Sequence, residues 1–383
     1  MKLPVETSSF SSPHAAGNIT EAVPSHLHVI PSATTFGSLT FSRWLFWVGL
    51  WLALTMLALI MCLRFGTHVI ELPKVASLFF QAMTSLGQAD VNTDPTNIIL
   101  FHVRLPRLLL ACLVGGSLAT VGVSLQALLR NPLADPSVLG ISSGAALGAA
   151  IALLFGVGVS MWSVSALPIC AFLGAVLSLL IIYQIAATNY GFSIYTLLLA
   201  GVVLSAIFSA LIMFLTSIAD PNRVFGMMAW LMGSLTGPDY QTLGVLAVYL
   251  GIGLFVLGSQ AQSLNLLTLG EEAARSLGVE VERVKKLVFF ATALVTGAVV
   301  AFSGIIGFVG LIVPHAVRLA LGADHRLLLP MAGLTGGIFL MVADTVARTV
   351  FSPAEIPVGV VTALVGGPVF LYLLMNRRAQ FIS

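Results

Sequence analysis

Residues 105–129 read LPRLLLACLVGGSLATVGVSLQALL, and this stretch decides the fold class of the chain. It carries one charged residue, Arg107, and its apolar residues follow one another without polar alternation. A run of about 20 apolar residues is long enough to cross the hydrocarbon core of a bilayer as a helix. Because lipid cannot hydrogen-bond a free backbone, such a segment forms a helix or belongs to a closed barrel. The lack of alternation favours the helix, so the stretch predicts an all-α membrane protein.

The composition of the whole chain supports the same class. Of 383 residues, 58% are hydrophobic and 8% are charged, whereas soluble domains carry about 25% charged residues. The mean hydropathy is +1.03. The net charge of +2 is too small to indicate nucleic-acid binding. Cys62, Cys112 and Cys170 lie far apart in apolar runs, which is typical of buried small side chains and not of a metal or redox site.

Apolar runs of this kind recur along the chain and predict about ten transmembrane helices. The membrane domain is expected at residues 43–378, followed by a short C-terminal tail at 379–383. Residues 1–42 are rich in Ser, Thr, Pro and His, so we expect a disordered cytoplasmic tail. Residues 64–103 are expected to form an external loop with one short helix near 73–86. The ten spans are expected at about 44–63, 105–129, 138–157, 164–187, 194–218, 241–260, 285–303, 306–320, 327–348 and 356–376.

The distribution of Lys and Arg predicts the orientation of these spans. With ten spans both termini lie on one side of the membrane. If that side is cytoplasmic, eleven of the 17 Lys and Arg residues face the cytoplasm and six face outward. This excess agrees with the positive-inside rule. The six outward residues are Arg64, Lys74, Arg104, Arg107, Arg223 and Arg348.

Short motifs occur along the membrane domain in a fixed order. They are Arg104–Arg107, Gln126–Leu128, Asn131–Pro136, Leu139–Gly140, Gly144–Ala145, Leu198–Gly201, Leu269–Gly278, Gly307–His315, Ala343–Arg348 and Glu355–Val360. With these motifs, residues 44–378 resemble the FecCD/BtuC family of permeases, which import iron–siderophore complexes, haem and cobalamin. The resemblance is specific to the family and does not select a substrate.

The resemblance implies the membrane-spanning permease of a bacterial ABC importer with a BtuC-like fold. Such a subunit forms a homodimer in the inner membrane, with both termini in the cytoplasm. Its expected partners are a separate ATP-binding subunit, a periplasmic or lipoprotein substrate-binding protein, and membrane lipid. The expected cargo is a bulky metal chelate, with an iron–siderophore as the leading candidate and cobalamin or haem as alternatives.

The chain itself lacks the sequence of a nucleotide-binding site. No Gly-rich loop ends in Gly-Lys-Ser/Thr, so no phosphate-binding P-loop is expected. We therefore expect no catalytic residue, metal site or cofactor on this chain, and ATP with Mg²⁺ on the partner ATPase.

The most charged stretch, within residues 268–286, is the candidate contact with that ATPase. Its sequence reads as two short helices joined at a glycine, and it mixes acids, alanines and leucines. A solvated loop is the alternative, but this mixture suits docking into a groove of a partner. In the resembling family the segment couples to the ATPase. The residues assigned to coupling are Gly270, Glu271, Ala273, Ala274, Arg275, Leu277 and Gly278.

Arg104, Arg107 and Arg348 lie on the predicted outer face. Arginines at helix ends often extend to the membrane interface without a further role. The resemblance makes them docking points for acidic side chains of the binding protein, through directional guanidinium–carboxylate pairs. Asp344 lies four residues before Arg348, and this spacing predicts a pair along the helix.

Asn131 and Leu133 lie between the second and third spans, in a loop bounded by Pro132 and Pro136. In the resembling family these positions form the cytoplasmic gate. An ordinary proline turn is the alternative. Residues 189–194 are a candidate second constriction.

An ATP-independent secondary transporter is the competing function. Such carriers usually hold ionisable groups near the middle of the membrane. Asp344 is the only acid well inside a predicted span, and Arg348 is expected to neutralise it. A membrane enzyme is disfavoured because no cluster of His, Asp and Glu with catalytic spacing occurs in the spans.

Overall fold

The computed structural model describes residues 40–66, 70–71, 73–75, 77, 95–156, 166–188, 191–236 and 238–382. The predicted tail at 1–42 lies outside these residues apart from its last three positions. Most of the predicted short helix at 73–86 and two of the six residues of the predicted constriction at 189–194 are also outside them.

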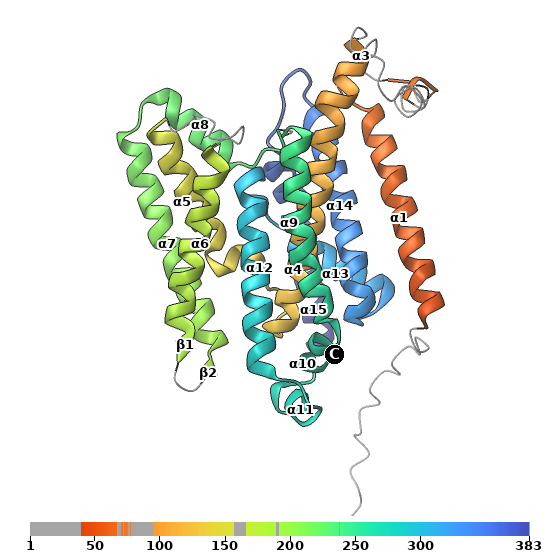
Figure 1. Cartoon of the computed structure of the whole chain (residues 1–383), viewed down its shortest axis with the longest axis vertical. Helices are drawn as coiled ribbons and strands as arrows, with labels where there is room; N and C mark the ends of the chain where they lie inside the picture. Colours follow the sequence, from red (N-terminus) through yellow and green to blue (C-terminus); the bar gives the residue numbers. More distant parts are fainter. Residues whose placement is uncertain are drawn as a thin grey trace, which may run out of the picture. The chain divides into compact units, whose positions relative to one another are not determined.

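Helices make up almost all of the described chain, and the all-α prediction is confirmed (Figure 1). Seven described helices are long and apolar enough to span a membrane, and three shorter apolar stretches occupy the other predicted spans. The elements are α1 (Phe41–Arg64), α3 (Pro95–Ile98), η2 (Ile99–Arg104), α4 (Leu105–Leu128), η3 (Pro136–Leu139), α5 (Ile141–Leu154), α6 (Ala166–Ala186), β1 (Ala187–Thr188), β2 (Gly191–Phe192), α7 (Ile194–Ile218), α8 (Pro221–Leu231), α9 (Tyr240–Ser259), α10 (Ala261–Thr268), α11 (Glu271–Ser276), α12 (Val281–Ser303), α13 (Val309–Leu321), α14 (His325–Thr349) and α15 (Val358–Ile382).

The second span begins earlier than the sequence suggested. Residues 95–103, predicted to belong to a loop, form α3 and η2 and run directly into α4, so that one helix of 34 residues extends from Pro95 to Leu128. Proline is favoured in the first turn of a helix, where its missing N–H is not needed. Pro106 lacks a donor inside this helix, and residues 99–104, which end two positions before it, form a π-helical turn. Wider turns of this kind accommodate local breaks in the helical ladder.

A small hairpin replaces part of the predicted loop after α6. Strands β1 and β2 have two residues each and pair antiparallel, with Ala187 opposite Phe192 and Thr188 opposite Gly191. Ser193 then caps α7 by accepting from the backbone N–H of Thr196. The paired strands and the Ser193 cap therefore lie between the two membrane helices α6 and α7.

Helix α4 forms the centre of the bundle, and almost all of its side chains are buried. It packs closely on α14 because both helices present glycine at the contact. A Cβ added at Gly115 would lie 2.2 Å from the backbone oxygen of Gly336. Small residues allow this approach, which gains van der Waals contact that lipid alone does not supply. Helix α1 contacts the bundle through α14, and most of its side chains remain exposed.

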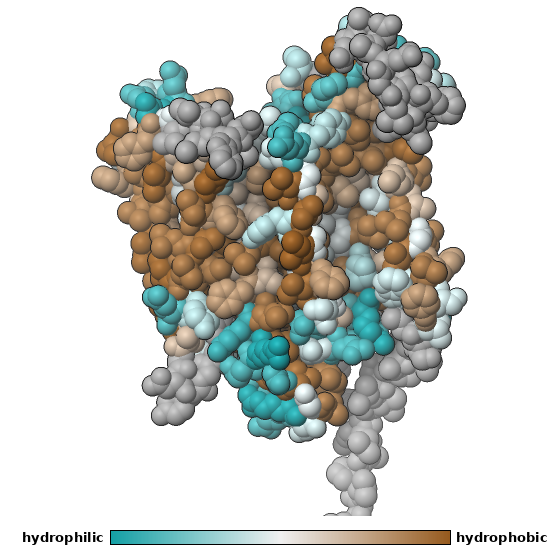
Figure 2. Space-filling view, viewed as in Figure 1, coloured by the Kyte–Doolittle hydropathy of each residue, from teal (hydrophilic) through white to brown (hydrophobic). Residues whose placement is uncertain are grey.

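The two ends of the bundle differ in their elements. One end, here the α11 end, carries α10, α11, the hairpin, the start of α1 and the C-terminus (Figure 1). The opposite end, here the α8 end, carries α3 and α8. Hydrophobic residues form a band between hydrophilic ends in Figure 2, as expected of a protein that spans a bilayer. The start of α1 and the end of α15 lie at the same end, as an even number of crossings requires.

Helix α13 is shorter than a membrane span, as predicted for the eighth apolar run. It has 13 residues and begins after an extended stretch in which Gly304 and Phe308 have φ of 65° and 69°. Gly304 also lies against α8, where an added Cβ would be 2.2 Å from the backbone oxygen of Trp230. The non-helical stretch 304–308 is buried or half-buried in the protein, which is where irregular backbone is tolerated in a membrane.

Candidate functional sites

The predicted coupling segment forms a compact double turn at the α11 end. Gly270 and Gly278 have φ of 119° and 86° and bound the short helix α11. The N–H of Val279 bonds to the carbonyl of Ala274, and that of Gly278 bonds to the carbonyl of Arg275. These two bonds form a Schellman C-cap, which favours glycine in the left-handed position. One of the two predicted short helices is present as α11, whereas the helix that follows Gly278 is the long α12.

Ion pairs attach α11 to the first turn of α12. The Lys285 ammonium lies 2.7 Å from a carboxylate oxygen of Glu271 and 3.3 Å from one of Glu282. Arg275 lies 3.5 Å from Glu271 on the same helix. Lys285 is almost fully buried. These pairs hold α11 against the bundle, so it can move with α12 as one body.

The exposed face of the coupling segment does not include every residue that was assigned to coupling. Ala274 is fully buried and faces the bundle, so it cannot contact a partner directly. Leu269 and Leu277 are instead 68% and 60% exposed, one on each side of α11. Glu272 and Arg275 are exposed between them. The segment thus presents two apolar side chains flanking charges, and Leu269 was not among the residues predicted for coupling.

The predicted gate loop follows α4 at the α11 end. The Asn131 carboxamide oxygen accepts from the backbone N–H of Leu133 at 2.9 Å, and Asp135 accepts from that of Ser137 at 2.9 Å. Arg130 adopts φ of 46°, an uncommon conformation for a residue with a side chain. Leu133 remains 42% exposed. The turns hold the loop locally, and Leu133 is free to contact another surface.

A cavity of about 240 Å³ lies between the gate loop and the coupling segment. Arg130 and Pro132 line it on the loop side, and Thr268, at the end of α10, lines it on the other side. The two predicted functional segments therefore face the same small space, although more than 130 residues separate them in sequence.

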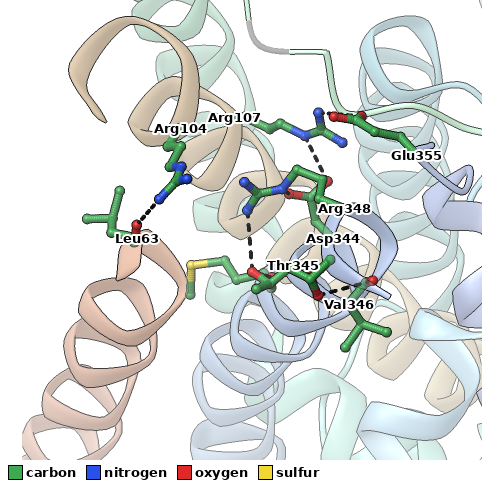
Figure 3. A network of polar contacts seen from close by, with 10 residues as sticks. Leu63, Arg104, Arg107, Asp344, Thr345, Val346, Arg348 and Glu355 are labelled. Carbon is green, nitrogen blue, oxygen red and sulfur yellow. Dashed lines mark hydrogen bonds and ion pairs between the residues drawn. The ribbon is translucent and has the colours of Figure 1, made fainter. Parts of the chain in front are cut away.

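A buried network of charges lies towards the α8 end, between α4, α14 and the segment that joins α14 to α15 (Figure 3). Asp344 is fully buried and accepts from Arg107 and from Arg348, each at 2.9 Å. Arg107 also lies 2.9 Å from Glu355. The predicted pair between Asp344 and Arg348 is confirmed. Two guanidinium groups and two carboxylates balance their charges, which lowers the cost of burial.

Arg104 belongs to a different contact. It is 3% exposed, and its Nη1 donates to the backbone oxygens of Leu63 and Arg64 at 2.9 and 3.4 Å. These carbonyls end α1, and basic side chains often satisfy the last carbonyls of a helix. Arg104 therefore ties α1 to the long second span, as Figure 3 shows.

The three predicted docking arginines thus lie in different environments. Arg104 and Arg348 are 3% and 6% exposed and bond within the chain, so in this structure their charges do not face a partner. Arg107 reaches the surface through Glu355, whose side chain is 50% exposed. Sequence reasoning quoted Glu355 only as part of a motif and gave it no role, because nothing local relates it to Arg107.

Comparison with known proteins places this arrangement in a family. Residues 54–376 match the model of the FecCD transport family. The cobalamin import system permease protein BtuC of Halobacterium salinarum is 44% identical over 287 residues, covering 75% of this chain and 76% of that protein. The hemin transport system permease protein HmuU of Yersinia pestis is 44% identical over 293 residues, covering 74% of this chain and 86% of that protein.

A solved structure supports the fold. It is an inward-facing conformation of a protein assigned to the metal-chelate type of ABC transporter. The TM-score is 0.72 at 34% sequence identity, and the match covers 87% of this chain and 99% of that one. The relatives are named as transport permeases and not as enzymes. The chain is a multi-pass membrane protein that belongs to the FecCD transport family.

Proposed function

We propose that this chain is the membrane-spanning permease of an ATP-driven ABC importer. The observation that carries the proposal is the family match over residues 54–376, together with a charged double turn that projects from one end of an apolar bundle. A polar projection at the membrane surface suits contact with a soluble subunit. ATP and Mg²⁺ bind that subunit, and the permease chain binds no cofactor of its own.

The α11 end faces the cytoplasm in this proposal. Arg275, Arg283, Lys285 and Lys286 all lie at this end, as the positive-inside rule requires for a cytoplasmic face. Both termini are then cytoplasmic and the membrane is the bacterial inner membrane. The exposed Leu269 and Leu277 insert into a groove of the ATPase, and Glu272 and Arg275 set the orientation through charge.

The α8 end then receives the substrate-binding protein. Arg107 and Glu355 form the rim that contacts it, while Arg348 supports the rim from within through Asp344 and Arg104 holds the end of α1. This division follows from burial, because a side chain bonded inside the fold positions its neighbours and does not bind a partner. Asn131 and Leu133 form the gate at the other end of the path.

A second copy of the chain completes the path. Helix α4 fills the centre of the described bundle, so a bulky substrate passes between two copies. Helices α7 and α15 carry exposed apolar side chains suited to such a membrane interface. The complex then contains two permeases and two ATPases.

The cargo is a bulky metal chelate in this proposal, with an iron–siderophore complex as the leading candidate. The named relatives carry cobalamin and hemin, which are both large metal-centred ring compounds.

An ATP-independent carrier is the alternative function. Asp344, which lies well inside a described span, disfavours a carrier because it is fully buried and two arginines bond it. A coupling carboxylate of a carrier must be free to exchange protons or ions.

Native mass spectrometry of the chain purified with its co-expressed ATPase tests the assembly. The expected mass is that of two permeases with two ATPases. A stable complex with ATPase activity that contains a single permease would contradict the proposal.

A further inference from the structure

A short corner joins α13 to α14 between the coupling segment and the gate loop. Only residues 322–324 separate the two helices, and Gly322 has φ of 93°. The N–H of Gly322 bonds to the carbonyl of Arg318, and the Asp324 carboxylate caps α14 by accepting from the N–H of Arg326. Both helix ends are therefore capped, and the corner is stiff. We call residues 318–326 the α13–α14 corner.

Asn265 attaches this corner to the coupling segment. It lies on α10, which packs directly against α11. Its oxygen accepts from the backbone N–H of His325 at 2.9 Å and lies 2.6 Å from Nδ1 of the same residue. Its nitrogen donates to Asp324 at 2.8 Å. Both ends of the Asn265 amide are thus bonded to the start of α14.

Gln126 attaches the same corner to the gate loop. It lies in the last turn of α4 and is 4% exposed. Its oxygen accepts from Arg318 at 2.9 Å, and its nitrogen donates to the backbone oxygen of Gly310 at 3.2 Å. Its backbone carbonyl accepts from the N–H of Asn131 at 3.1 Å. One residue therefore bonds to α13 through its side chain and to the gate through its backbone.

The far end of the gate loop also rests on α13. A Cβ added at Gly310 would lie 2.9 Å from the Pro136 ring and 2.9 Å from the backbone oxygen of Leu118. Gln126 and Pro136 bracket the loop, and both contact α13. A shift of α13 must therefore displace both ends of the loop together, because neither contact leaves spare room.

We propose that Asn265 and Gln126 are positioning residues that transmit movement of the coupling segment to the gate through the α13–α14 corner. The inference rests on the proposed function. Helix α10 also packs on α4 and buries Leu264 and Leu267, but apolar contacts of this kind tolerate sliding. Hydrogen bonds are directional and fix the register of one element on the next. The bonded chain from α10 to α14, across the corner to α13, and on to α4 is continuous.

The test uses the complete complex of permease, ATPase and binding protein in proteoliposomes. The variants are Asn265→Ala, Gln126→Met and the double variant. The control is Gln262→Ala, which removes an exposed amide from the same helix as Asn265. Three quantities are measured: ATPase co-purification, ATP hydrolysis rate and ATP-dependent uptake of the chelate that the parent transports.

Each single variant should keep ATPase co-purification and a hydrolysis rate within about twofold of the parent, while uptake per ATP hydrolysed falls about tenfold or more. Since the two residues act in series, the double variant should be no worse than the more severe single variant. The control should match the parent. Should Gln126→Met fail to assemble, Gln126→Glu keeps an acceptor for Arg318, loses the donor to Gly310, and should show the same uncoupling.

Three results would overturn the inference. Loss of ATPase co-purification in Asn265→Ala would make α10 part of the docking surface. A parallel fall in hydrolysis and uptake would indicate a structural role. A double variant whose defect is the product of the single defects would show independent action. A parent complex without ATP-dependent uptake would instead contradict the proposed function, so the two failures are distinguishable.

Discussion

At the scale of single residues, Asp344 is held from two sides. It is fully buried and bonds two arginines from different helices. Its pair with Arg348 could be predicted, because residues four apart on a helix are neighbours. Its pair with Arg107 could not, because 237 residues separate them and only the packing of α4 on α14 brings them together.

Replacing Asp344 by Asn should destabilise the fold strongly. The change keeps the volume but leaves Arg107 and Arg348 as like charges without their shared carboxylate. Breaking a buried ion pair in this way costs about 3–5 kcal/mol. Glu355→Gln is the matched control, because that half-exposed carboxylate should contribute less than about 1 kcal/mol. Unfolding in detergent measures both, and equal stability of the two variants would contradict this account of the network.

Asp324 gives a prediction for acid stability. Partial burial alone would raise its pKa, but hydrogen bonds from Arg326 and Asn265 outweigh this effect and lower the pKa to about 2. A group with a lowered pKa stabilises the fold above its unfolded pKa of about 3.9. That contribution is lost as the pH falls through about 2.

The Asp324→Asn variant should therefore differ from the parent at neutral pH and approach it between about pH 4 and 2. Melting temperatures measured over this range test the sign. A difference between the two proteins that stays constant from pH 5 to 2 would show that the carboxylate is not the group responsible.

At the scale of elements, hydropathy located the ten apolar helices of the described residues, because each presents a long apolar surface to the bundle or to lipid. It placed the start of the second span about ten residues too late, because η2 contains His102 and Arg104. These polar residues lower the local hydropathy, yet Arg104 finds its partners at the end of α1. A pattern along the sequence does not contain that contact.

The coupling segment also could be predicted only in part, because its packing depends on contacts that are distant in sequence. The glycine joints could be predicted, since Gly270 and Gly278 adopt backbone conformations that favour glycine. The buried face of α11 could not be predicted, because the helix has only six residues and its packing depends on α12. Ala274→Arg would therefore damage the fold itself and is a poor test of docking.

Leu277→Arg is the sharper test of the docking surface. The Leu277 side chain is 60% exposed, so stability should change little. The charge should obstruct an apolar groove on the ATPase and lower co-purification about tenfold or more. Gln262→Arg, at another exposed position on α10, is the control and should bind normally. Unchanged co-purification of Leu277→Arg would remove this residue from the interface.

The contact between α4 and α14 gives a second prediction at this scale. In Gly336→Ala the new methyl group would lie 2.3 Å from the backbone oxygen of Gly115, so the helices must separate. Overpacking of this kind costs about 1–3 kcal/mol. Gly251→Ala on α9 meets no atom within 4 Å and should be neutral or slightly stabilising. Melting temperatures compare the two, and an equal effect would contradict the close packing.

At the scale of the whole molecule, the bundle presents different chemistry at its two ends. A network of balanced charges lies towards the α8 end, and a gate loop and a coupling segment share a cavity at the α11 end. The family could be predicted from motifs in a single sequence, because they occur in order along nearly the whole membrane domain. The route between the two functional segments could not, because it consists of contacts between residues distant in sequence.

Uptake into proteoliposomes tests the central claim most directly. Liposomes would contain the permease and its ATPase, with ATP inside and the binding protein loaded with ferric siderophore, cobalamin or haemin outside. The account predicts uptake of at least one chelate that requires ATP and stops when the ATPase carries a substitution of its P-loop lysine. Uptake of the same chelate by the permease alone, driven by a proton or sodium gradient, would contradict it.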